Sequence, residues 1–270
     1  MIAKIFRSFR DLQDDLGRID AALAYMALCL RHFDSCASLS GDRTKYMKEH
    51  AAKHSIRVFL PDDTFPQKHV FLSSTVAVHS EWDRFLSELL DELPGFKYPE
   101  INKSLRNDGE SRLSFFLRMM GKSAPGKLTD LSQPLLNICE YLRLVRNYYA
   151  HRLDTPQKEC LRLFKQIRAN MKDWPKKFGK LSFSSECCEI GFDDVLIFTI
   201  AVKMLAEDIC KKLAPDINYL LEHPDTRAFI AREKRQVSKE SFRLFLFDRF
   251  GLDRDNADRL SDVFVKEALV

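Results

Sequence analysis

Apolar positions recur at helical spacing along most of the chain, and short polar or proline-containing breaks separate them. The pattern predicts helices over residues 5–34, 45–59, 67–93, 113–120, 132–151, 156–172, 195–213 and 253–270. It also places a break near Gly17 and a helix cap at Asp154 or Thr155. Only residues 180–190 have a pattern that suits two short strands, with a turn at Ser184-Ser-Glu186. The sequence therefore predicts an all-α protein, a bundle of helices in which 180–190 is the one candidate for a small β-hairpin.

Two proline breaks divide the chain into three stretches. The segment Pro61-Asp-Asp-Thr-Phe-Pro66 is the clearest interruption of the first half, and Pro215 ends the strongly apolar helix before it. Beyond Pro215 the composition changes, and closely spaced aromatics at 242–250 need burial against the core or against another subunit. We predict an N-terminal helical extension at 1–60, a helical core at 61–215 and a C-terminal helical extension at 216–270.

The helix predicted over 132–151 ends in residues suited to phosphate chemistry. One buried stripe is formed by Leu135, Ile138, Leu142, Val145 and Tyr149. A second face carries Glu140, Leu144, Asn147 and His151, so Asn147 and His151 are neighbours one turn apart. Arg146 lies about 140° around an ideal helix from His151, but its long side chain reaches the same space. Arg binds phosphate oxygens through two parallel hydrogen bonds, and His transfers protons near neutral pH.

The segment Arg146-Asn-Tyr-Tyr-Ala-His151 resembles the Arg-Asn-x-x-x-His signature of the HEPN superfamily. The match includes the Asn directly after Arg, the Ala-His ending and the apolar helix in front. A second Arg-to-His spacing, Arg43 to His50, lacks the adjacent Asn and is interpreted as accidental. The resemblance covers roughly residues 65–215. It implies an all-helical fold, and many HEPN members are metal-independent endoribonucleases of toxin, abortive-infection and CRISPR-associated systems.

What the resemblance implies is RNA cleavage by attack of the ribose 2′-hydroxyl on its own phosphate. His151 is then expected to transfer the proton, Arg146 to stabilise the phosphate and Asn147 to position its neighbours. In the family two motifs face one composite site, so the resemblance implies a homodimer or a HEPN-bearing partner, without a metal or a cofactor. An antitoxin or another defence-system protein is a further expected partner. Two alternatives stay open: a non-catalytic HEPN-type subunit that binds a nucleotide or a partner, and a helical scaffold with a coincidental motif.

Two neighbours of the motif are candidates for substrate binding. Tyr148 lies with Tyr141 on another face of the helix and is a candidate to stack on a base. Glu140 shares the face of His151, where it either orients the His, crosses a dimer interface or stays solvated. Tyr149 lies on the apolar stripe, which favours a packing role. Some HEPN toxins carry, two residues after the His, a Tyr that a partner nucleotidyltransferase modifies; this chain has Leu153 there, so the sequence does not support that control.

Charge and cysteine usage change this picture little. A net charge of +4 permits RNA binding without implying it. The seven cysteines include the adjacent pair Cys187-Cys188 but no Cys-x-x-Cys, so we predict no metal site and a reducing cytosol. No stretch has the character of a signal peptide or a membrane span. We therefore expect a cytoplasmic protein that does not enter a membrane.

Overall fold

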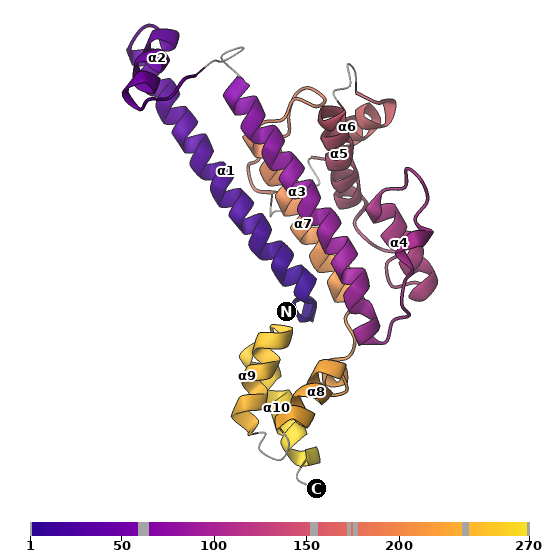
Figure 1. Ribbon diagram of the computed structural model, residues 1–270. Coiled ribbons are helices and arrows are strands. Elements are labelled where there is room, and N and C mark those ends of the chain that lie inside the picture. Colours follow the sequence, from indigo (N-terminus) through magenta and orange to yellow (C-terminus); the bar gives the residue numbers. More distant parts are fainter. Residues whose placement is uncertain are drawn as a thin grey trace. The chain divides into compact units, whose positions relative to one another are not determined.

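The computed structural model describes residues 2–58, 65–151, 156–171, 174, 178–233 and 238–268, and over these residues its regular structure is entirely helical (Figure 1). The all-α prediction is thereby confirmed. The helices within this part are α1 (Arg7–Leu39), α2 (Arg43–Lys53), α3 (Phe65–Glu92), α4 (Arg112–Ser123), α5 (Gln133–Ala150), α6 (Lys158–Ala169), α7 (Phe192–Leu213), α8 (Pro224–Glu233), α9 (Lys239–Phe250) and α10 (Arg254–Ala268). Within it, too, no helix has both the length and the apolarity that a membrane span requires.

The chain forms two compact units, and each draws on segments that are distant in sequence. Unit 1 comprises Met1–Asp14, Glu81–Leu136 and Val202–Val270. Unit 2 comprises Asp15–Ser80 and Asn137–Ala201. The division of the chain at residues 60 and 215 stays a prediction.

In unit 1 the first turn of α1 is capped by a side chain from the end of α3. The Glu92 carboxylate accepts hydrogen bonds from the backbone N–H of Arg7 at 2.9 Å and of Ser8 at 3.2 Å. The first N–H groups of a helix have no partner within the helix, so this carboxylate satisfies two of them. Burial raises the pKa of Glu92, although the hydrogen bonds from Ser8 and Arg7 act in the opposite direction.

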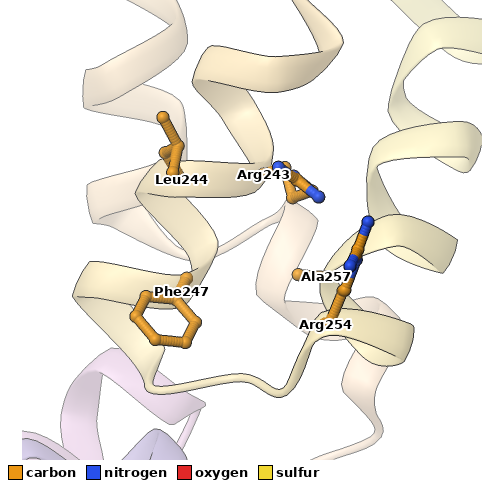
Figure 2. Close-up of a pocket in the computed structure, with 5 residues that line it drawn as sticks. All are labelled: Arg243, Leu244, Phe247, Arg254 and Ala257. Atoms are coloured by element: carbon orange, nitrogen blue, oxygen red, sulfur yellow. The ribbon is translucent and has the colours of Figure 1, made fainter.

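The aromatic stretch of α9, also in unit 1, is only partly buried. Phe242, Leu246 and Phe250 are buried, whereas Leu244 is 51% exposed and Phe247 is 57% exposed. The burial of Phe242 and Phe250 confirms the expectation for these two aromatics, and burial of Phe247 against another subunit stays a prediction. Figure 2 shows the exposed pair on α9, opposite residues of α10. The groove of about 360 Å³ between them is lined by Arg243, Leu244, Phe247, Arg254 and Ala257.

Unit 2 packs around Tyr141 in the middle of α5. Its ring is fully buried, and its centroid lies 6.0 Å from that of Phe164 on α6, 5.5 Å from Phe183 and 6.1 Å from Phe198 on α7. The predicted apolar stripe of α5 is buried at Leu135, Ile138, Leu142 and Val145. Tyr141 therefore belongs to the core, although the sequence places it on the same face as Tyr148.

Residues 180–190 form an irregular loop, so the predicted β-hairpin is wrong. The backbone N–H of Ser182 donates to the Asp193 carboxylate at 3.1 Å, and that of Ser184 donates to Asp194 at 2.9 Å. Burial raises the pKa of Asp194, against the hydrogen bonds that Ser184 donates. Because side chains satisfy these backbone donors, the segment does not need the hydrogen bonds of a partner strand.

The predicted helix boundaries lie within five residues of those observed, except that α2 ends at Lys53, six residues before its predicted end. Helices α8 and α9 were not predicted. α1 continues unbroken through Gly17, and α7 begins at Phe192 instead of Val195. α6 begins at Lys158 instead of Pro156, after Gln157. The caps predicted at Asp154 or Thr155, the break at 61–64 and the comparison at Leu153 lie outside the described residues.

Candidate functional site at the end of helix α5

The sequence motif occupies the last turn of α5, within unit 2. The backbone N–H of His151 donates to the carbonyl of Asn147 at 3.0 Å, so the helical hydrogen-bond pattern reaches His151. This bond places the two residues one turn apart, as their spacing predicts. Asn147 is half-buried and His151 is exposed, whereas Leu144 on the same predicted face is buried. The C-terminal end of this face is therefore open to a ligand.

Arg146 has donors that the described residues do not satisfy. Its Nη1 donates to Oδ1 of Asn147 at 3.1 Å. Its Nε is buried and has no hydrogen-bond partner among the residues that the structure describes. A buried donor without a partner costs about 1–3 kcal/mol, and this cost would be recovered by an anion that accepts from it. The Arg146–Asn147 pair is the feature of the site that points most directly to an anionic ligand.

The ring of His151 stands at the exposed end of the helix. It makes no hydrogen bond or ion pair with any residue in the described part of the chain. A structural histidine at a helix end typically bonds the last carbonyls, and that role does not fit an exposed ring without such a bond. The imidazole is therefore accessible to a substrate, and no described side chain orients it.

Tyr148 lines a cleft that the sequence did not predict. The cleft has a volume of about 200 Å³ and lies between α3, the end of α5 and the loop at 187–190. The Tyr148 ring is half-buried and meets that of Tyr149 edge-on, with centroids 5.0 Å apart. Lys68 of α3 also lines the cleft, so a positive charge and an aromatic ring belong to the same cleft. The sequence around Lys68 does not indicate its position in the cleft, because only the packing of α3 brings it there.

The last two motif neighbours are held by contacts within unit 2. The hydroxyl of Tyr149 donates to the backbone carbonyl of Cys188, and burial raises the pKa of Tyr149 above its ordinary value. A neutral, bonded phenol fits the packing role predicted for it. The Glu140 carboxylate accepts from Nε and Nη2 of Arg143 at 2.9 and 2.5 Å. Its role in orienting His151 or crossing a dimer interface stays a prediction.

These groups together are suited to binding a phosphate ester. The guanidinium of Arg146, whose Nε has no partner among the described residues, lies about 1.4 turns before the exposed imidazole of His151 on the same helix. A cleft lined by a cation and an aromatic ring lies at the same helix end. No model of a known protein family, no curated protein and no solved structure matches this chain. The resemblance to HEPN proteins therefore rests on the motif, and the all-α structure agrees with the fold that the resemblance implies.

Proposed function

We propose that this protein is a metal-independent endoribonuclease of the HEPN type, which acts in the cytoplasm as a toxin or defence effector. It cleaves RNA by attack of the 2′-hydroxyl and leaves 2′,3′-cyclic phosphate and 5′-hydroxyl ends. The observation that carries the proposal is the Arg146 guanidinium, which lies near the exposed His151. Asn147 accepts a hydrogen bond from it at 3.1 Å, and its buried Nε has no partner in the described part of the chain. Arg is suited to phosphate because its planar fork of donors matches two phosphate oxygens.

Each motif residue has one task in this reaction. Arg146 binds the scissile phosphate and stabilises the negative charge that develops on it. His151 accepts the proton of the 2′-hydroxyl or donates a proton to the leaving 5′-oxygen. Asn147 positions the guanidinium through its hydrogen bond. Tyr148 stacks on a base, and Lys68 binds a neighbouring phosphate in the same cleft.

The reaction needs both a proton acceptor and a proton donor, and the motif has one imidazole per chain. A homodimer supplies two copies of His151 and two of Arg146 to one composite site. Asn147 is half-buried and His151 is exposed, so the end of α5 is open for such a pairing. Two chains of net charge +4 also place a stronger positive field on RNA than one chain does. A partner protein that masks this helix end is the expected form of inhibition.

The second candidate is a non-catalytic subunit that binds a nucleotide or a partner protein. It is favoured by the ring of His151, which no side chain among the described residues orients. Catalytic histidines typically have one ring nitrogen fixed by a hydrogen bond so that the other presents the correct tautomer. In this alternative Arg146 and Lys68 bind phosphates and no bond is broken.

Cleavage of a mixed RNA pool tests the proposal, with and without EDTA. We expect the wild type to cleave under both conditions and to leave 2′,3′-cyclic phosphate ends. Arg146→Ala and His151→Ala are expected to lose about 10²-fold or more of the rate. His50→Ala is the matched control, because His50 belongs to the accidental match and stacks on Tyr46.

The pattern of activities separates the candidates. Equal cleavage by the wild type and both motif variants would contradict a role for the motif. Binding of a nucleotide by the wild type that Arg146→Ala abolishes, without cleavage by any protein, would instead support the non-catalytic subunit.

A further inference from the structure

Three cysteine thiols from two separate segments meet in unit 2. Cys160 lies in the first turn of α6, and Cys187 and Cys188 lie in the loop before α7. The sulfur of Cys160 is 3.7 Å from that of Cys187 and 3.6 Å from that of Cys188. The two loop sulfurs are 3.8 Å apart. The three sulfurs therefore form a nearly equilateral triangle.

The size of this triangle matches one face of a tetrahedral metal site. Zinc binds thiolate sulfur at about 2.3 Å, and a tetrahedral angle then places two sulfurs about 3.8 Å apart. A disulfide requires about 2.05 Å between two sulfurs and leaves the third unused. The observed distances of 3.6 to 3.8 Å suit a single ion that contacts all three sulfurs.

The backbone at Cys188 is shaped to bring two adjacent side chains together. In extended backbone neighbouring side chains point to opposite sides. Cys188 instead has φ 65°, in the left-handed region that few residues other than glycine adopt. Hydrogen bonds from both ends hold it there: its N–H donates to the Tyr141 hydroxyl at 3.0 Å, and its carbonyl accepts from Tyr149. Strained backbone that neighbouring groups hold in place is typical of functional sites.

The position of Cys160 favours a thiolate, and two of the three cysteines line a path to solvent. Cys160 is the third residue of α6, where unpaired backbone N–H groups favour negative charge. The hydroxyl of Tyr141 lies 4.0 Å from the sulfur of Cys187, at the distance of an outer-shell donor. Cys187 and Cys188 both line the cleft that Tyr148 and Lys68 share. A ligand from the cleft can therefore reach an ion bound by the three sulfurs.

We propose that Cys160, Cys187 and Cys188 form a three-thiolate site for Zn²⁺ whose fourth position is filled by water from the cleft. Binding replaces the three thiol protons with the ion, so three protons are released and the bound unit carries a charge of −1. The ion ties the start of α6 to the loop that forms one wall of the cleft. The site is separate from Arg146 and His151, and it does not depend on RNA cleavage.

The metal content of the full-length, reduced protein tests this site. After incubation with Zn²⁺ and dialysis, we expect one zinc ion per wild-type chain. Cys160→Ser and Cys188→Ser are expected to lose the ion, whereas Cys29→Ser retains it because Cys29 is exposed on α1. Replacement of zinc by Co²⁺ is expected to give the intense thiolate-to-metal absorption of a tetrahedral site in the wild type and in Cys29→Ser alone.

A second measurement uses only the wild-type chain, because serine at a buried cysteine can disturb folding. Iodoacetamide labelling with and without Zn²⁺ is read by mass spectrometry. Cys187 is partly exposed, and we expect zinc to slow its labelling about tenfold or more, since a metal-bound thiolate is a poor nucleophile. Cys29 and Cys36 are expected to label at the same rate in both samples. Folded, reduced protein that binds no zinc, or that binds zinc while Cys187 labels at an unchanged rate, overturns the proposal.

Discussion

The hydroxyl of Tyr149 donates a hydrogen bond to the backbone carbonyl of Cys188, and this bond joins the end of α5 to the loop before α7. About two turns earlier on the same helix, the hydroxyl of Tyr141 accepts from the N–H of the same cysteine at 3.0 Å. Both backbone polar groups of Cys188 are thus bonded to α5. The helix that carries the motif therefore also positions one wall of the cleft.

Removal of one hydroxyl tests this link. Tyr149→Phe is expected to lower the free energy of unfolding by about 1–2 kcal/mol, because it leaves the Cys188 carbonyl without its donor. Urea denaturation followed by circular dichroism measures the change. Tyr148→Phe is the control, because its hydroxyl has no hydrogen bond to the described residues. Equal losses in the two variants would show that the bond does not stabilise the fold.

Arg146→Lys distinguishes a forked guanidinium from a simple positive charge. We expect the variant to lose about 10²-fold of the RNA cleavage rate, because an ammonium cannot donate two parallel hydrogen bonds to one phosphate. Initial rates on one RNA substrate measure the loss. Arg143→Lys is the matched control on the same helix, since Arg143 is bonded to Glu140. A similar loss in both variants would argue against a specific phosphate contact at Arg146.

In unit 1, His223 caps the first turn of α8 with a neutral ring. Its Nδ1 accepts from the backbone N–H of Asp225 at 3.2 Å. Burial lowers the pKa of His223; the Asp225 carboxylate opposes this and Arg249 adds to it. The unfolded chain therefore takes up a proton at His223 more readily than the folded chain does. The neutral ring contributes fully to the free energy of unfolding above the ordinary pKa of about 6.5. This contribution is lost as the pH falls from there to the lower pKa of the folded state.

The free energy of unfolding is therefore expected to fall as the pH is lowered from about 7.5 to about 5, and to fall less in His223→Asn. Asn keeps a side-chain cap at this position but does not titrate. Urea denaturation at several pH values measures the two slopes. His54→Asn, at an exposed position, is expected to keep the slope of the wild type. If His223→Asn kept the pH dependence of the wild type, the loss of stability at low pH would come from other titratable groups.

Two phenylalanines of α9 are expected to differ sharply in their contribution to stability. Phe242 is fully buried, with its ring centroid 4.3 Å from that of Phe264, whereas Phe247 is 57% exposed. Phe242→Ala is expected to cost about 3–5 kcal/mol, and Phe247→Ala about 0.5 kcal/mol or less. Thermal and urea denaturation measure both. A large loss in Phe247→Ala would indicate that its exposed face is covered in solution.

Local sequence was sufficient to predict the limits of α5, the helix that carries the motif. Its predicted limits, Ser132 and His151, differ from the observed Gln133–Ala150 by one residue at each end. Helical periodicity and a first-turn proline are properties of neighbouring residues, so they appear in the sequence without knowledge of the fold. For the same reason the adjacency of Asn147 and His151 could be predicted.

Tertiary packing decided the features that depend on contacts between residues far apart in the sequence. The 180–190 segment is a loop because carboxylates and a phenol from other elements bond its backbone. Lys68 reaches the cleft from α3, and Cys160 meets Cys187 across 27 residues of sequence. Such encounters depend on which helices pack together, whereas spacing reports only on residues within a few turns of each other. The sequence by itself thus determined most of the helices and the positions of the motif residues along one of them. Only the folded chain decided the cleft and the group of three thiols.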